Sequence, residues 1–263
     1  MRSKFQRIVL LTLIGVVLST ACEEDITGRN KRFAAEEPFD FEVERNTRTY
    51  LSLEAINGAI EITGASGGTS ISVSGIRRVE SDSFEDANAH LPLLEVGIDS
   101  TSAGVVVRTV QPAVSAGRDY IVNYTISLPE DFAVMVAGAN GDVTTRSLKN
   151  GVTVQFANSK ILGLGIEGNT VMAVANGQID ATVTLGFGES IALGVANGEI
   201  SLKIPEDTSA EFSATAANGD ITLKNLTLSN RVQTPTSVTG TLGNGDGTIT
   251  LDVGNGNIGV DGF

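Results

Sequence analysis

The chain has little of the chemistry on which most enzymes and cross-linked domains depend. Its 263 residues include one cysteine, one histidine, six prolines and no tryptophan. A single cysteine excludes an internal disulfide. The only histidine, His90, cannot supply a two-histidine metal site, and no Ser-His-Asp set can be assembled around it. We therefore expect no catalytic residue, no metal and no cofactor, and a protein that is not an enzyme.

Basic residues are also scarce. Lys and Arg number 18 against 31 Asp and Glu, for a formal net charge of −13. Nucleic-acid partners select for clusters of Lys and Arg, so this balance argues against them. Glycine is abundant instead, with 30 residues, and Val, Ile and Thr are frequent. This composition favours strands joined by tight turns, and we predict an all-β fold.

The N-terminus has the pattern of an export signal. Three basic residues precede an apolar run over residues 8–18, which is shorter than the roughly 20 residues needed to cross a bilayer. The run ends in LSTAC, which resembles the lipobox of bacterial lipoproteins. That resemblance implies cleavage after residue 21 and lipid attachment to Cys22. The alternative is an ordinary secretory signal with an incidental cysteine.

These features divide the chain into a signal peptide (1–21), a flexible tether (22–38) and a β-strand-repeat domain (39–263). The tether is predicted because its segment EEDITGRNKRFAAEEP is charged and has no periodicity. Glu23, rather than Asp, follows the cysteine. For a lipoprotein this favours the outer membrane or cell surface, with the membrane as one partner through the N-terminal lipid.

A repeat organises the rest of the sequence. AVANGQI (173–179) returns as GVANGEI (194–200) and TAANGDI (215–221), with looser echoes upstream. The marker asparagines are Asn140, Asn158, Asn176, Asn197 and Asn218. They recur at intervals of about 18–21 residues, and such periods are typical of stacked coils, here of three short strands each. Because Asn-Gly also marks hairpin turns, an antiparallel meander is the alternative.

Alternation around the markers predicts which side chains face inward. Ile191, Leu193 and Val195 precede Asn197 by even steps, which places the asparagine on the inward face. Neighbouring coils lie about 4.8 Å apart, so each carboxamide can donate to the next one along the stack. We predict a buried structural asparagine ladder whose following glycine supplies a positive φ. Further markers are expected at Asn244, after an interval of 26 residues, and at Asn255 after a shorter one.

The same register creates an outward column two residues after each marker. Its members are Asp142, Lys160, Gln178, Glu199 and Asp220. Stacking would align them at a spacing of about 4.8 Å, as a flat polar strip without a pocket. This strip is the candidate recognition surface for an extended partner, either an envelope glycan or another envelope protein. The alternative is a column that only solvates one edge.

The N-terminal half is less regular. DSFEDANAHL (82–91) predicts a short helix with Phe84, Ala87 and Leu91 on one face and Asp82 with Glu85 as its capping pair. Together with AINGAIEITG, VVVRTVQP and VNYTISLPEDF, the coils resemble the bacterial β-strand-repeat family of unknown function labelled putative adhesins, whose fold is called a toastrack.

That resemblance covers roughly residues 39–263. It implies a right-handed single-stranded β-solenoid in envelope proteins without an established enzymatic activity. In this sequence the repeat gives about 18–21 residues per coil. We expect a lipid-anchored envelope protein with a non-catalytic binding, adhesion or scaffolding role. The alternative is a carbohydrate-active β-helix enzyme, a lyase or hydrolase, which would need paired carboxylates on one exposed face.

Overall fold

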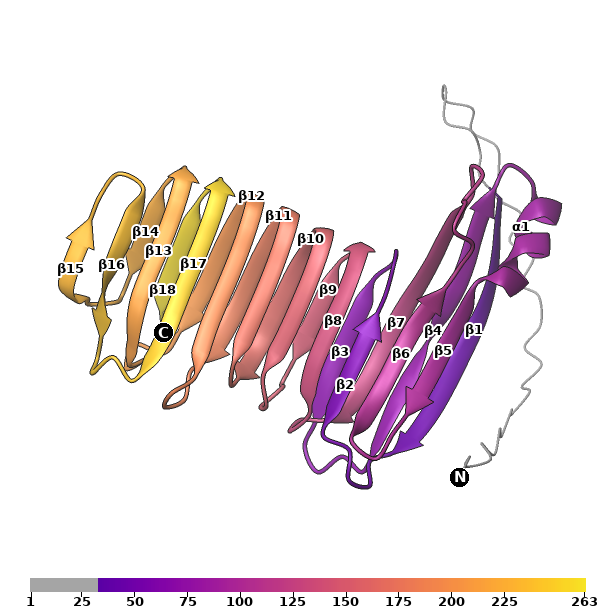
Figure 1. Cartoon of the computed structure of the whole chain (residues 1–263), viewed down its shortest axis with the longest axis horizontal. Helices are drawn as coiled ribbons and strands as arrows, with labels where there is room; N and C mark the ends of the chain where they lie inside the picture. Colours follow the sequence, from indigo (N-terminus) through magenta and orange to yellow (C-terminus); the bar gives the residue numbers. More distant parts are fainter. Residues whose placement is uncertain (1–32) are drawn as a thin grey trace. The chain divides into compact units, whose positions relative to one another are not determined.

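The computed structural model describes residues 33–263, which fold almost entirely into strands joined by short turns (Figure 1). The predicted signal peptide and Cys22 lie outside the described residues. The helical elements are α1 (Phe84–His90) and the 3-10 turn η1 (Leu91–Leu93). The strands are β1 (Phe33–Glu44), β2 (Tyr50–Glu54), β3 (Ile60–Ala65), β4 (Ser70–Ser81), β5 (Glu95–Ser100), β6 (Gly104–Val110), β7 (Asp119–Pro129), β8 (Ala133–Asn140), β9 (Val143–Arg146), β10 (Val152–Glu167), β11 (Thr170–Thr184), β12 (Ser190–Ile204), β13 (Ala210–Asn218), β14 (Ile221–Lys224), β15 (Ser229–Gln233), β16 (Ser237–Leu242), β17 (Gly247–Asn255) and β18 (Ile258–Gly262).

The strands pair into one continuous 18-stranded sheet that folds over itself into two layers. The long strands β10, β11 and β12 belong to both layers, because their first halves pair on one side of the corner and their second halves on the other. One layer runs β5, β6, β2, β8, β10, β11, β12, β17, β13, β16, β15. The other runs β1, β4, β7, β3, β9, β10, β11, β12, β18, β14.

The central coils pair in parallel, in the register predicted by the repeat. Asn158 lies opposite Asn176, which lies opposite Asn197. This pairing confirms the all-β stacked-coil fold and excludes a simple antiparallel meander for these strands. The prediction of three short strands per coil is wrong, because each coil contributes one strand segment to each of the two layers.

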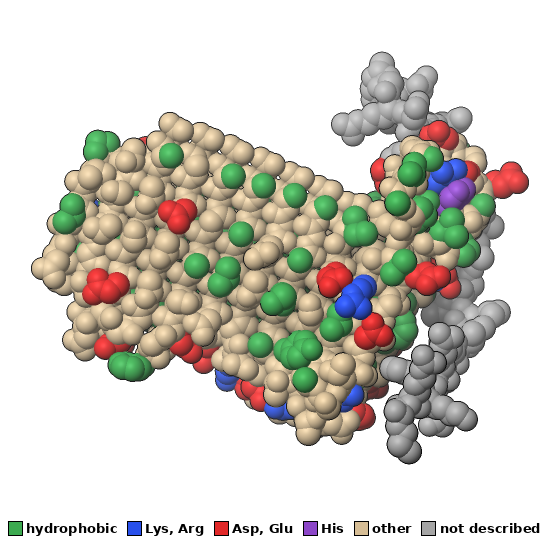
Figure 2. All heavy atoms as spheres, viewed as in Figure 1, with side chains coloured by type: hydrophobic (Ala, Val, Ile, Leu, Met, Phe, Trp, Pro, Cys, Tyr) green, Lys and Arg blue, Asp and Glu red, His purple; other side chains and the backbone are tan. Residues whose placement is uncertain are grey.

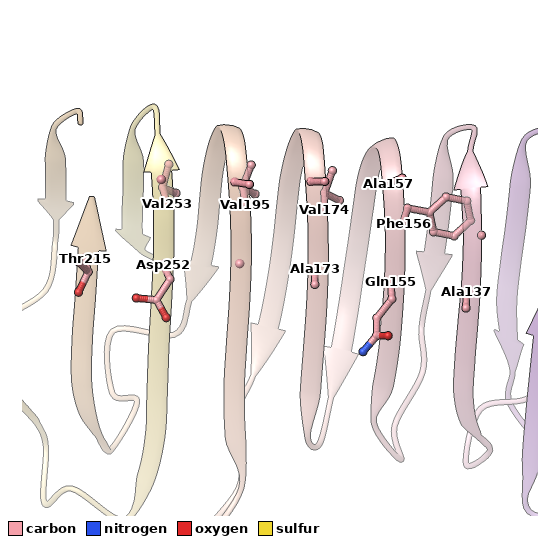
Figure 3. A pocket seen from close by; sticks show the side chains of 15 residues that line it. Ala137, Gln155, Phe156, Ala157, Ala173, Val174, Val195, Thr215, Asp252 and Val253 are labelled. Carbon is pink, nitrogen blue, oxygen red and sulfur yellow. The ribbon is translucent and has the colours of Figure 1, made fainter. Parts of the chain in front are cut away.

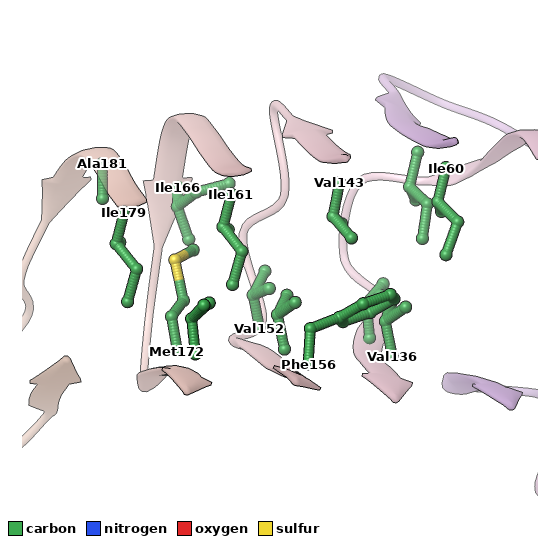
Figure 4. Packing of buried hydrophobic residues seen from close by; sticks show 14 of the residues in the cluster. Ile60, Val136, Val143, Val152, Phe156, Ile161, Ile166, Met172, Ile179 and Ala181 are labelled. Carbon is green, nitrogen blue, oxygen red and sulfur yellow. The ribbon is translucent and has the colours of Figure 1, made fainter. Parts of the chain in front are cut away.

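Side-chain alternation produces the core between the layers. In β12, Ile191, Leu193 and Val195 are buried before the corner, and Ile200 and Leu202 are buried after it. Figure 4 shows side chains from both layers meeting in this way along the stack. Burial of these aliphatic side chains, at about 25 cal/mol per Å² of apolar surface, is the main favourable term in folding.

The C-terminal coil departs from chain order. After β14 the chain makes the β15–β16 hairpin and returns as β17 and β18, which lie between β12 and the β13–β14 pair. The antiparallel strand β16 pairs with the other side of β13 and covers that edge. The last coil in the sequence is therefore not the last coil in space.

The N-terminal end contains the antiparallel strands and the helix. The predicted boundary of the tether at residue 38 is wrong, because β1 already begins at Phe33 and pairs with β4 along its whole length. The acidic residues that suggested a flexible tether are held by cross-strand ion pairs, Glu36 with Arg78 and Glu37 with Arg77. A charged, aperiodic segment can thus be an edge strand when its partner carries the opposite charge.

Helix α1 has the predicted position and a different cap. Ser83, not the Asp82–Glu85 pair, accepts a hydrogen bond from the Asp86 N–H at 3.1 Å. Ala87 and Leu91 are buried as expected, whereas Phe84 is 59% exposed. The described residues form one compact unit that includes this helix.

Candidate functional site

The predicted asparagine ladder is present and longer than the repeat alone indicated. From Asn140 onward, each Nδ2 donates to the Oδ1 of the neighbouring carboxamide at 2.7–3.0 Å. The first member, Asn57, accepts within the ladder and donates to the Tyr120 carbonyl oxygen at 3.1 Å. In spatial order the ladder contains Asn57, Asn140, Asn158, Asn176, Asn197, Asn255 and Asn218. Asn255 lies between Asn197 and Asn218, because β17 lies between β12 and β13. Asn244 is not a member.

The inward orientation predicted for the ladder is wrong. Asn197 and the preceding Ala196 are both exposed, so alternation stops after the buried Val195. The coils also stack closely at the position after the asparagine: a Cβ at Gly198, whose φ is +141°, would lie 1.6 Å from the carbonyl oxygen of Gly177 in the neighbouring coil. Glycine at this position therefore permits the close stacking of the coils, and the asparagine before it projects to the surface.

An exposed ladder has unused hydrogen-bonding capacity. A carboxamide has two N–H donors and an oxygen with two lone pairs. Each internal member uses one donor and one lone pair within the ladder. Its exposure leaves the second N–H and the second lone pair open to solvent or a ligand. The corner of the stack is thus a polar row repeated at the strand spacing of about 4.8 Å.

The predicted polar strip is also brought together, with one insertion. Lys160 lies opposite Gln178, and Gln178 lies opposite Glu199. Asn257 then intervenes before Asp220, donating to the Glu199 carboxylate at 3.4 Å and accepting from the Asp220 N–H at 3.0 Å.

At the other end of the strip, Asp142 accepts a hydrogen bond from the backbone N–H of Lys160 at 3.1 Å. The Nζ of Lys160 lies 3.8 Å from the Asp180 carboxylate. Gln178 donates to the same carboxylate at 2.7 Å. Part of the strip's polarity is therefore used in joining neighbouring coils.

The strip is not flat, contrary to expectation. A shallow hollow of about 340 Å³ lies along it. The polar residues that line it are Gln178, Asp180, Glu199, Ser201, Asp220, Thr222 and Asn257. Carboxylates from three coils thus face one depression. Among residues 33–263, no group of three or more His, Cys, Asp or Glu side chains is placed to hold a metal ion.

A second and larger surface lies on the other side of the ladder and was missed by sequence reasoning. It is a shallow groove of about 970 Å³ across β8, β10, β11, β12, β17 and β13 (Figure 3). We call it the small-residue groove; its lining includes Ala137, Gly138, Gln155, Phe156, Ala157, Ala173, Val174, Ala175, Gly194, Val195, Ala196, Thr215, Asp252, Val253 and Gly254.

The repeat contains the signal for this groove. An alanine directly precedes the ladder asparagine at Ala157, Ala175 and Ala196. Two positions before the alanine there is another small residue, such as Ala173 or Gly194. Short side chains at both outward positions leave the surface hollow beside the projecting asparagines. At about 4.8 Å per strand, the groove extends about 24 Å along the stack. Asp252 is its only charged lining residue.

His90 has a structural position, as its place on a short helix indicates. Its Nδ1 lies 2.8 Å from the Asp86 backbone oxygen. The Asp86 carboxylate accepts two hydrogen bonds from Arg118, both at 2.7 Å, and another from Ser81. The hydrogen bonds from Arg118 are the main reason that the pKa of Asp86 lies well below its usual range. This cluster attaches the loop before β7 to helix α1.

Elsewhere in the core, burial raises the pKa of Tyr124 to about 12, despite a 2.7 Å hydrogen bond between its hydroxyl and Thr109. No helix among residues 33–263 has the length and apolar character needed to span a membrane.

Stacked parallel coils, an external asparagine ladder and an elongated groove define a repeat protein with an extended surface rather than an enclosed pocket. The chain belongs to the Toastrack DUF4097 family, which matches residues 39–261. The family expected from the sequence is thereby confirmed. No curated protein is similar enough in sequence to be matched to the chain.

Two solved structures are similar to the chain at low sequence identity. A "putative cell adhesion protein" from Clostridium sporogenes is 14% identical with a TM-score of 0.50, over 87% of this chain and 100% of that one. A "putative adhesin" from Bacteroides fragilis is 13% identical with a TM-score of 0.34, over 87% of this chain and 97% of that one. At 14% identity the likeness to the first of these structures shows the fold alone.

Proposed function

We propose that the chain is a lipid-anchored protein of the bacterial cell envelope with a non-catalytic, adhesion-type role, and that it binds an extended glycan along the small-residue groove and asparagine ladder. The observation that carries the proposal is the alignment of a shallow groove with a row of exposed carboxamides at one repeating spacing. The family and the names of the related structures support an adhesion-type role.

The chemistry of the surface favours a hydroxyl-rich polymer. Each exposed carboxamide offers a donor and an acceptor, and a sugar hydroxyl can satisfy both. The small side chains of the groove allow an extended chain to approach closely. Successive coils repeat the same weak contact, so affinity would come from multivalency rather than from one deep pocket.

Groove-filling substitutions test the proposal. Ala175→Gln and Ala196→Gln together place longer side chains in the groove at exposed positions, where each change should alter the free energy of unfolding by less than about 0.5 kcal/mol. Ala217→Gln is the matched control, because Ala217 also precedes a ladder asparagine and does not line the groove. Binding to isolated cell walls should fall for the double variant and persist for the control.

Two treatments of the cell walls identify the partner. Periodate oxidation of sugar diols should abolish binding, whereas protease digestion should leave it intact. The opposite result would identify a protein partner. A second variant changes the whole polar strip, Asp142, Lys160, Gln178, Glu199 and Asp220, to Ser. Loss of binding only in this variant would place recognition on the strip instead of the groove.

The hollow in the strip favours one alternative function, a carbohydrate-active enzyme. Asp180, Glu199 and Asp220 bring carboxylates to it, and glycoside cleavage uses pairs of such groups. Incubation with acidic and neutral glycans tests this alternative. Depolymerisation that is lost in Glu199→Gln would support an enzyme, and its absence across the panel would leave the binding role.

Membrane anchoring is tested separately at Cys22. Cys22→Ser should prevent acylation and release much of the protein from the membrane fraction, because acyl chains supply most of the membrane affinity of such proteins. Unchanged mass and unchanged membrane association would contradict the proposed anchor.

A further inference from the structure

Exposed apolar side chains gather at the α1 end of the domain, away from the groove and the strip. Phe33 is 48% exposed, Phe84 59% and Val114 75%. They belong to three separate segments: the start of β1, the first turn of α1 and the loop between β6 and β7. On the face shown in Figure 2, apolar side chains gather near the single histidine.

The strand pairing brings these segments to one place. Phe33 lies opposite Ser81 at the end of β4, and Phe84 follows only three positions after Ser81. Glu80 lies opposite Asp119 at the start of β7, directly after the loop that carries Val114. The start of β1, the end of β4 and the start of β7 therefore share one end of their layer.

The loop is fixed to this end and is apolar at its surface. The two hydrogen bonds between Arg118 and Asp86 hold the base of the loop against α1. Residues 113–117, with the sequence AVSAG, are all exposed and carry no charge. We call Phe33, Phe84 and the loop 113–117 the apolar tip.

The chain itself indicates what covers the tip. Phe33 is the first residue of β1, and Cys22 precedes it by a short stretch of chain. That stretch of about 11 residues can span at most about 40 Å, at roughly 3.5 Å per residue. The tip contains Phe33, where the described domain begins. If Cys22 is acylated, the tip therefore stays close to the lipid surface.

We propose that the apolar tip rests on the membrane that holds the lipid of Cys22, with its aromatic and aliphatic side chains in the interfacial region. This inference depends on the proposed lipid anchor. Insertion of a few apolar side chains is weak alone, but the tether makes it intramolecular and therefore effective. The domain then stands with its α1 end toward the lipid and its coils directed away from it.

The charges around the tip determine the kind of contact. Asp82 and Glu85 are exposed beside Phe84 and would be repelled by anionic headgroups. The contact must therefore come from apolar insertion rather than from electrostatic attraction. Raised salt should leave it intact, since screening acts on charge interactions.

A quenching experiment on the full-length lipoprotein tests the orientation. The native chain has only Cys22, whose sulfur the lipid occupies, so an added cysteine is the only reactive thiol. Ala113→Cys reports on the tip, and Gln233→Cys in β15 reports on the exposed hairpin of the last coil. Each variant is labelled with bimane and reconstituted into phosphatidylethanolamine and phosphatidylglycerol vesicles that contain a doxyl-labelled phospholipid.

The label at Ala113→Cys should be quenched about twofold or more on contact with the interface, while the label at Gln233→Cys stays bright. Replacing Phe33, Phe84 and Val114 by Ser should remove this quenching. The matched control replaces three other exposed apolar side chains elsewhere, Met135, Phe187 and Val232, and should preserve it. Thermal melting verifies folding; if the triple variant unfolds, Val114→Ser alone should still reduce the quenching.

The outcomes separate the inference from the anchor on which it rests. A mass without lipid would overturn both. A lipidated protein whose two labels are equally bright, or equally quenched, would keep the anchor and overturn the orientation. Loss of quenching in raised salt would also contradict apolar insertion as its cause.

Discussion

The ladder predicts a graded effect on stability that depends on position rather than on residue type. Asn197 makes two ladder hydrogen bonds, donating to Asn176 at 3.0 Å and accepting from Asn255 at 2.7 Å. Asn218 is the last member and makes one, donating to Asn255 at 2.9 Å. Each of the two residues is exposed and precedes a glycine at its own corner, so they differ mainly in the number of ladder hydrogen bonds.

The magnitude follows from the bond count. A protein hydrogen bond contributes a net ~0.5–1.5 kcal/mol, and exposed partners can return to water. We expect Asn197→Ala to lower the free energy of unfolding by about 1–2 kcal/mol and Asn218→Ala by roughly half of that. Glu199→Gln, on the adjacent strip, should stay within about 0.5 kcal/mol. Urea denaturation of the purified protein measures the free energy of unfolding of the parent and of each variant.

A double-mutant cycle isolates the ladder bond itself. Asn176→Ala and Asn197→Ala should be less than additive when combined, with a coupling free energy of about 0.5–1 kcal/mol, because each single change already removes their shared bond. Equal losses for Asn197→Ala and Glu199→Gln, or a larger loss at Asn218 than at Asn197, would refute the ladder as a source of stability.

Further predictions concern the corner and the Asp86 cluster. Gly198→Ala should cost more than about 4 kcal/mol or prevent folding, because its Cβ would lie 1.6 Å from the Gly177 carbonyl oxygen; a melting temperature close to the parent's would contradict the tight corner. Asp86→Asn should lower the melting temperature at pH 7 and increase proteolysis of the loop before β7. Since bonding to Arg118 lowers the pKa of Asp86, its stabilisation is present above the usual carboxyl pKa of about 4 and is lost as pH falls below it. The difference between parent and Asp86→Asn should therefore shrink in acid, and a constant difference would refute the assignment.

The periodic sequence predicted the part of the fold that periodicity controls. Parallel stacking requires equivalent residues to face each other, so near-constant intervals were enough to place Asn158 beside Asn176 and Asn176 beside Asn197. The ladder followed from that register and the chemistry of the carboxamide.

Chain order could not predict the last coil. Asn218 and Asn255 have equivalent side chains, so either could donate next to Asn197 and satisfy the ladder equally well. The choice depends on the β15–β16 hairpin, which returns the chain to the space beside β12. The missed strand at residues 33–38 has a similar cause, because its charges are paired by Arg77 and Arg78 from a different part of the sequence.

The groove was missed because strict alternation was extended across a corner where it does not hold. An inward asparagine would have placed Ala196 alone on the outer surface, which gives a flat strip and no hollow. In the structure alternation stops after the buried Val195, so Ala196 and Asn197 both face outward. The alanine then forms the floor of the groove and the asparagine forms its rim. The two consecutive outward residues therefore explain the exposure of the ladder, the hollow beside it and the proposal that an extended ligand lies along both.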